Sequence, residues 1–173
     1  IESEITNTID LTDCLEMVAS FDELLVLMQY CPIPDLMIER FLTKLRHAIL
    51  IHRTSIDVKS CKKFVTRLGC YCFLTEFVFA VTDEEEFLLE ELSNAHKNLK
   101  SLPPTEMDLL IVACYQSLAD FPNFSPDQFP NRSMGVDELI TVHWTEPLEE
   151  ARLQKDIPRI SQISDGVSLE VQR

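Results

Sequence analysis

The scarcity of glycine constrains this chain more than any other feature, since only three glycines occur in 173 residues. A β domain places turn residues between short strands about every 8–12 residues, and no such alternation recurs here. Apolar residues recur instead at three- and four-residue steps, which is the spacing of amphipathic helices. The pattern predicts an all-α fold, a compact bundle of roughly six to eight helices with no sheet.

Two segments carry the clearest helical patterns. Residues 35–53 place their apolar side chains on one face of a helix and most of their charges elsewhere. Residues 57–81 begin as an amphipathic pattern and become apolar all round from Leu68. A helix that is apolar all round is buried, so this segment is predicted to be the central helix. Gly69 within it would let a neighbouring helix approach closely.

Two capping boxes mark helix starts. Ser20 with Glu23, and Thr82 with Glu85, have the spacing at which two side chains satisfy free backbone N–H groups. The acidic residues 83–86 lie at the second of these starts, where they are expected to be solvated and to complement the helix dipole. The other segments expected to be helical are residues 10–31, 82–100, 106–119, 135–144 and 147–156.

The chain is expected to comprise a helical bundle domain over residues 1–156 and a linker over residues 157–173 that leads toward a following domain. Position 1 is not Met, no secretory leader is recognisable, and the last residues begin a new amphipathic pattern. We therefore expect a piece of a longer protein. The longest apolar run, residues 68–81, is too short and too interrupted by Thr75 and Glu76 to span a bilayer.

The charge balance argues against two classes of partner. Fifteen Lys and Arg face 29 Asp and Glu, which gives a net charge of −14. Nucleic acids and anionic membranes are bound largely through Lys and Arg, so neither is an expected partner. The six cysteines lie in apolar periodic segments and the histidines lack ligand spacing, which favours reduced core thiols over a zinc site. A cytoplasmic location is expected.

Glu76 is the one charged residue within the apolar run. An unpaired buried carboxylate is costly, so Glu76 is either a functional group with a raised pKa or, as is commoner, a structural carboxylate paired with a cation. His143 and Trp144 form a candidate interaction surface, although Trp is more commonly buried in the core. His47 and His52 lie on adjacent turns of one helix and would face one cleft.

Signatures of a self-contained enzyme are missing. There is no Gly-rich loop between a strand and a helix, no Walker lysine and no nucleophile elbow. No catalytic, cofactor-binding or metal-ligating residue is therefore assigned in this segment, and no cofactor is expected to bind it.

Residues 72–80, followed by the acidic residues 83–86, resemble a cysteine–phenylalanine–leucine, polar, glutamate, aromatic signature. The signature is that of bacterial tetratricopeptide-repeat proteins that end in a class I, S-adenosylmethionine-dependent methyltransferase domain. Residues 110–118 and 146–150 are similar to two further pieces of these proteins, in the same order. Residues 157–173 resemble the lead-in to the methyltransferase domain.

The resemblance covers about residues 35–173 and implies a role for the segment. In that family a helical stretch lies between the repeats and the catalytic domain, so this chain would be a non-catalytic structural and interaction module. Its expected partners are the adjoining repeats, the methyltransferase domain and a protein substrate. S-adenosylmethionine would bind the domain that follows Arg173, outside this segment.

Two other readings remain open from the residues alone. The runner-up is a free-standing helical adaptor, whose acidic surface steers a basic partner protein. A helical enzyme that uses Glu76 with His47 or His52 is a third class. The downstream reading frame separates the first two, because an adaptor would end or stay helical.

Overall fold

The structure, a computed structural model, describes residues 8–98 and 105–156, and those residues contain no strand. The all-α prediction is confirmed. The elements are α1 (Thr8–Ala19), α2 (Asp22–Tyr30), α3 (Leu36–Ile51), α4 (Val58–Leu74), α5 (Asp83–Asn98), α6 (Glu106–Val112), η1 (Leu118–Asp120), η2 (Pro126–Gln128), α7 (Met134–Ile140), η3 (Thr141–Thr145) and α8 (Glu146–Asp156).

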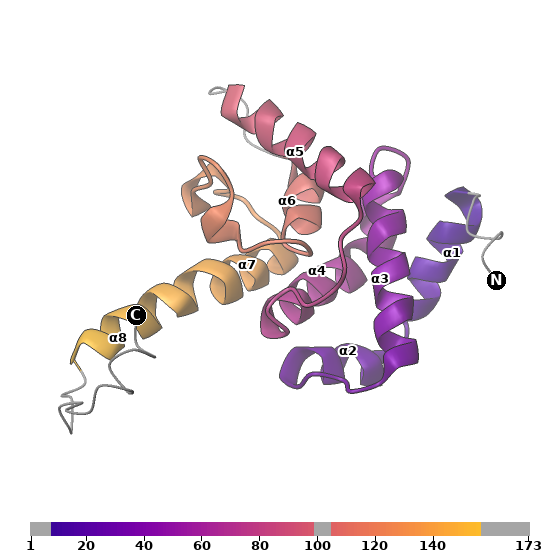
Figure 1. The fold of residues 1–173 in the computed structure, drawn as a ribbon, viewed down its shortest axis with the longest axis horizontal. Helices are drawn as coiled ribbons and strands as arrows, with labels where there is room; N and C mark the ends of the chain where they lie inside the picture. The colour runs from indigo at the N-terminus through magenta and orange to yellow at the C-terminus, as the bar shows by residue number, and fades with distance from the viewer. Residues whose placement is uncertain (1–7, 99–104, 157–173) are drawn as a thin grey trace.

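Helix α4 is the centre of the bundle, as the sequence predicts. It contacts α1 and α2 on one side and α6 and α7 on the other (Figure 1). The side chains of Phe64, Val65 and Leu68 are completely buried between these neighbours. Burying such side chains supplies most of the driving force that holds helices of this kind together.

Gly69 makes the packing around α4 closer than any other residue would allow. A Cβ atom at this position would lie 2.9 Å from Cδ2 of Leu139 and 3.2 Å from Cβ of Ala113. Leu139 belongs to α7, and Ala113 follows the last residue of α6. The prediction that Gly69 permits close approach is therefore confirmed, and two elements use the space.

The predicted extent of the central helix was wrong at its C-terminal end. Helix α4 ends at Leu74 rather than near residue 81. Glu76 and Phe77 both have left-handed backbone conformations, with φ of 53° and 55°. The N–H of Phe77 donates to the carbonyl of Cys72, and that of Glu76 to the carbonyl of Phe73. These bonds form a Schellman motif, which ends the helix although the apolar sequence continues.

One of the two capping boxes forms. The backbone N–H of Thr82 donates to the Glu85 carboxylate, and that of Glu85 donates to the Thr82 hydroxyl. The prediction at Ser20 was wrong, because Phe21 is the N-cap of α2 and makes no side-chain cap. The Ser20 hydroxyl instead donates to the carbonyl of Met17 and closes the end of α1.

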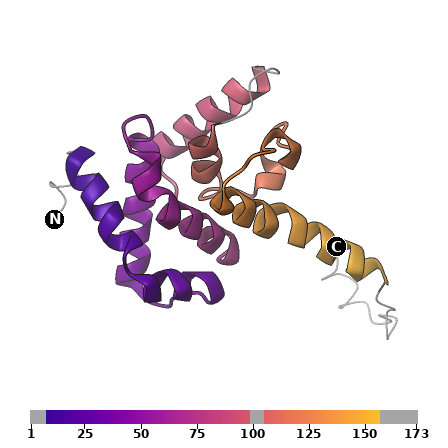
Figure 2. The ribbon, with the colours of Figure 1, turned by 180° about the vertical axis from the view of Figure 1, so that it is seen from behind.

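The C-terminal third of the described chain is one nearly continuous helix. Helix α7, the π-helical turn η3 and α8 follow one another without a break. Helix α8 continues directly from η3 and extends away from the bundle in both views (Figures 1 and 2). The predicted linker, residues 157–173, lies outside the described residues.

Four cysteines are buried, as expected for core thiols, whereas Cys14 is half-buried and Cys31 is exposed. Burial raises the pKa of the Cys61 thiol to about 11 and that of Cys70 to about 12. These thiols are therefore protonated at neutral pH and act as small core residues. Across residues 8–98 and 105–156, no helix is long and apolar enough to cross a membrane.

Candidate functional site

Glu76 lies in the turn that ends α4, and its side chain is exposed. The prediction of a buried carboxylate was therefore wrong. Glu76 is exposed because the Schellman motif turns the chain outward before Glu76 can enter the core. Among the described residues, no hydrogen bond or ion pair joins Glu76 to His47 or His52, so the predicted dyad is not assembled.

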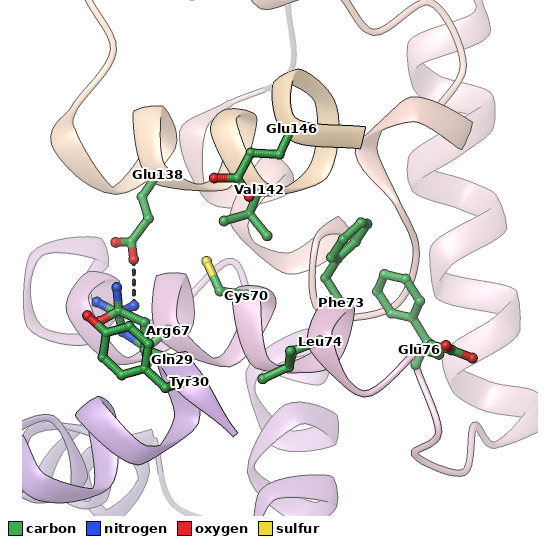
Figure 3. A pocket seen from close by; sticks show the side chains of 11 residues that line it. Gln29, Tyr30, Arg67, Cys70, Phe73, Leu74, Glu76, Glu138, Val142 and Glu146 are labelled. Atoms are coloured by element: carbon green, nitrogen blue, oxygen red, sulfur yellow. Dashed lines mark hydrogen bonds and ion pairs between the residues drawn. The ribbon is translucent and has the colours of Figure 1, made fainter. Parts of the chain in front are cut away.

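Glu76 borders an open hollow of about 680 Å³, which we call the main groove. Figure 3 shows its floor formed by Cys70, Phe73 and Leu74 of α4. The end of α2 supplies Gln29 and Tyr30 at one end, and Glu76 stands at the other. The opposite wall comes from α7, η3 and α8 through Glu138, Val142 and Glu146.

Three carboxylates and one guanidinium line the main groove. Arg67 forms an ion pair of 2.5 Å with Glu138 across the groove (Figure 3). Glu76 and Glu146 have no ion-pair partner among the side chains that the structure describes. The groove therefore combines an apolar floor with a rim whose net charge is negative.

A second hollow of about 340 Å³, the side hollow, adjoins the main groove. It shares Leu74 and Glu76 with the main groove, so these two residues stand between the hollows. Its other walls include Ile33, Val78 and the carboxylate-bearing Glu39. Tyr71 closes its base, where the phenol oxygen accepts a 2.9 Å hydrogen bond from the backbone N–H of Ile33.

His143 lies in the core beneath the main groove. Its side chain is fully buried, and the ring of Phe73 lies 4.5 Å away between centroids. Because a carbonyl only accepts, the 3.2 Å contact between Nε2 and the Gly69 oxygen fixes the proton on Nε2. Nδ1 is left buried without a hydrogen-bond partner. Burial lowers the pKa of His143 to about 4, against a smaller opposing effect of the Gly69 hydrogen bond.

Of the interaction surface predicted from the sequence, His143 drops out because it is fully buried, whereas Trp144 stays partly exposed. His143 offers no surface to a partner in this structure. Trp144 is half-buried and packs edge-on against Phe124 at 5.4 Å between ring centroids. Their common role is to hold η3 and the loop around Phe124 against the bundle.

The most unusual buried group is a cluster of Arg46, Glu85 and Tyr115. The Arg46 and Glu85 side chains are each only 1% exposed, and the Arg46 Nη2 to Glu85 Oε1 distance is 3.9 Å. The Tyr115 hydroxyl donates a 2.6 Å hydrogen bond to Glu85. Arg46 also donates to the carbonyl of Ala80 at 2.7 Å, and its guanidinium carbon lies 4.1 Å from the centroid of the Tyr115 ring. The ion pair, the hydrogen bonds and the ring contact thus compensate most of the charge that is buried in the cluster.

Glu85 is ionised in this cluster. Burial by itself raises the pKa of Glu85, but hydrogen bonds from Tyr115 and Thr82 outweigh it, with a further contribution from Arg46, and the pKa lies below its usual value. His47 Nδ1 lies 3.6 Å from the same carboxylate, and the His47 side chain is 38% exposed. The expectation that residues 83–86 are all solvated is wrong for Glu85, which points inward.

Sequence reasoning missed this cluster although a signal was present. Arg46 shares the helical spacing of the apolar positions Leu42, Leu45 and Ile49, and all of them are buried. Glu85 has the same relation to Leu92 on α5, two turns later. A charged residue at a core position of the helical pattern predicts a buried pair.

The described residues offer no metal centre, since no group of three His, Cys, Asp or Glu side chains comes together among them. His47, a candidate base in the sequence, has its Nδ1 3.6 Å from the buried carboxylate of Glu85. Compared with known protein families, curated proteins and solved structures, the chain shows no match. The main groove and the side hollow are thus the features that a functional proposal can use.

Proposed function

We propose that this chain is the non-catalytic helical interaction module of a tetratricopeptide-repeat, S-adenosylmethionine-dependent methyltransferase. It would hold a protein substrate or partner against a methyltransferase domain that follows Arg173. The main groove is the observation that carries the proposal, because an open hollow with an apolar floor suits the side chains of a protein segment. The methyltransferase context rests on the resemblance of residues 72–80, 110–118 and 146–150 alone.

A positioning role fits how methyl transfer is catalysed. The cofactor supplies the reactive methyl group when it is bound to its own domain. The protein chiefly has to orient the acceptor toward it, and effective molarity rises steeply when the acceptor is held in place. A rigid bundle with a docking groove would supply that orientation without a reactive group of its own. The free-standing adaptor is the alternative, in which the same groove binds a partner without any enzyme attached.

The test uses the full natural chain that contains this segment. Leu74→Gln would remove apolar surface that the main groove and the side hollow share. Leu153→Gln on α8 is the matched control, because Leu74 is 40% exposed and Leu153 is 50% exposed. We expect Leu74→Gln to lower transfer of labelled methyl groups to protein acceptors while S-adenosylmethionine binding and the control stay unchanged. A full chain without methyl transfer would refute the enzyme context. Unchanged acceptor methylation in Leu74→Gln would refute the positioning role.

A further inference from the structure

The charges around the groove define the kind of partner that fits it. Glu76 and Glu146 on the main groove, and Glu39 on the side hollow, have no ion-pair partner among the side chains that the structure describes, which leave out residues 8–10, 58–60, 98 and 156 of the helices. The guanidinium of Arg67 is already engaged by Glu138. An incoming segment therefore meets an excess of negative charge at the rim and apolar side chains on the floor.

We propose that the groove binds a basic amphipathic segment of a partner protein, with apolar side chains on Leu74 and Phe73 and Lys or Arg side chains at Glu76 and Glu146. This inference rests on the proposed interaction function and names the chemistry of its ligand. Helical segments of this kind dock apolar anchors in a groove while flanking charges set orientation and specificity. An acidic or neutral segment would leave the rim carboxylates uncompensated.

The backbone turn at Glu76 determines where its carboxylate stands. Glu76 occupies the left-handed position of the Schellman motif, where glycine is the usual residue. The place at which Glu76 stands, between the main groove and the side hollow, gives its carboxylate access to a ligand that crosses both.

The experiment measures binding of three fluorescein-labelled peptides of about four helical turns to the 173-residue chain by polarisation. The first peptide carries Leu at helical spacing and Arg elsewhere. The second replaces Leu with Ala, and the third replaces Arg with Gln. We expect the Leu/Arg peptide to bind most tightly, because it alone matches both the floor and the rim.

Two matched variants locate the binding. Glu76→Gln/Glu146→Gln removes two rim carboxylates, and Glu90→Gln/Glu91→Gln removes two exposed carboxylates of α5 away from the groove. The first double variant should weaken binding of the Leu/Arg peptide about tenfold, and the second should leave it nearly unchanged. Equal weakening in both variants would mean non-specific attraction to the net charge of −14 and would overturn the proposal.

The remaining outcomes separate this inference from the proposed function. Equal binding of the Leu/Gln peptide, still lost in Leu74→Gln, would overturn the basic partner but leave a docking groove. Equal binding of the Ala/Arg peptide would overturn the apolar anchors. Absence of binding by all three peptides would overturn the inference, and the methyl-transfer measurement would then decide the interaction function by itself.

Discussion

At the scale of single residues, Glu76 holds a backbone conformation that suits glycine better than any other residue. Its φ of 53° places Cβ in the crowded left-handed region, while its N–H still completes the helix-ending hydrogen bond. The exposed side chain makes no hydrogen bond or ion pair with the described residues. The conformation is therefore imposed by the turn rather than by the side chain.

Replacing Glu76 with glycine should stabilise the protein. We expect Glu76→Gly to raise the free energy of unfolding by about 1 kcal/mol, because the strain disappears while the Schellman motif remains. Urea denaturation monitored by circular dichroism measures the change. Glu76→Ala is the control, since it removes the charge but keeps a Cβ at positive φ. An equal gain in Glu76→Ala would assign the effect to charge and contradict the strain argument.

Arg46 is the second residue whose environment predicts a large effect. Replacing Arg46 with Met keeps most of the volume but leaves the ionised Glu85 carboxylate buried without its cation. We expect Arg46→Met to lower the free energy of unfolding by about 3–5 kcal/mol. Arg152→Met, on an arginine that is 74% exposed, should change it by less than about 0.5 kcal/mol. A loss below about 1 kcal/mol for Arg46→Met would show that the buried Glu85 carboxylate does not depend on Arg46 for its stability.

His143 should make stability depend on pH. Its folded pKa of about 4 is below the unfolded value of about 6.5, so the unfolded state binds more protons between these values. The stability that the neutral His143 contributes is therefore fully present above about pH 6.5 and is lost as the pH falls toward 4. Between about pH 7.5 and 5 the group should account for a loss of about 2 kcal/mol.

The His143→Leu variant isolates this contribution. Its unfolding free energy should fall by about 2 kcal/mol less than that of the wild type over the same pH interval. Urea denaturation at the two pH values gives both differences. Identical pH dependence in the two proteins would mean that His143 is not held neutral by its burial against Phe73 and Gly69.

At the scale of elements, the close packing of α4 against α7 and the end of α6 depends on a single missing methyl group. Gly69→Ala would place a Cβ 2.9 Å from the Leu139 side chain. Alanine is the better helix former by about 1 kcal/mol, but the clash outweighs this gain. We expect a net loss of about 1–2 kcal/mol in unfolding free energy.

A double-mutant cycle tests whether contact with Leu139 is the cause. In a Leu139→Ala background the side chain that Gly69→Ala would meet is shortened, so the cost of adding the methyl group should fall by at least half. Strictly additive effects of the two substitutions would place the origin of the loss elsewhere.

The elements differ in how far the sequence predicts them, because only some of them are determined by residues close together in the sequence. Helices α3 and α5 follow from apolar spacing and, for α5, from the Thr82–Glu85 capping box, all of which act within one or two turns. The end of α4 does not, because the apolar pattern resumes at residues 77–81 and no glycine marks the turn. Val78 and Val81, expected in a buried helix, are instead exposed.

The candidate site was predictable only in part, for a related reason. The sequence marks Glu76 as a charge within an apolar run, but its exposure depends on a turn that the local pattern does not reveal. The main groove takes its walls from α2, α4 and α8, which are far apart in the sequence. A hollow of this kind depends on tertiary packing, and neither spacing nor composition specifies it.

At the scale of the whole molecule, the bundle and α8 are energetically distinct. The core runs from α1 to η3 around α4, whereas the described side chains of α8 are exposed apart from a half-buried Pro147. Figures 1 and 2 show the helix leaving the body of the protein. A helix of 11 residues without packing is only marginally stable in water.

Proline substitutions in the two regions should therefore differ sharply. Ala151→Pro lies in the middle of α8, and Ala48→Pro lies on the buried face of α3. We expect Ala151→Pro to lower the unfolding free energy by less than about 1 kcal/mol, because α8 can fray without exposing the core. Ala48→Pro should cost more than about 3 kcal/mol, because it breaks a helix that the core needs. Urea denaturation gives both values, and hydrogen exchange should find the α8 amides unprotected. A large cost for Ala151→Pro, with protected amides, would mean that α8 packs against another part of the chain.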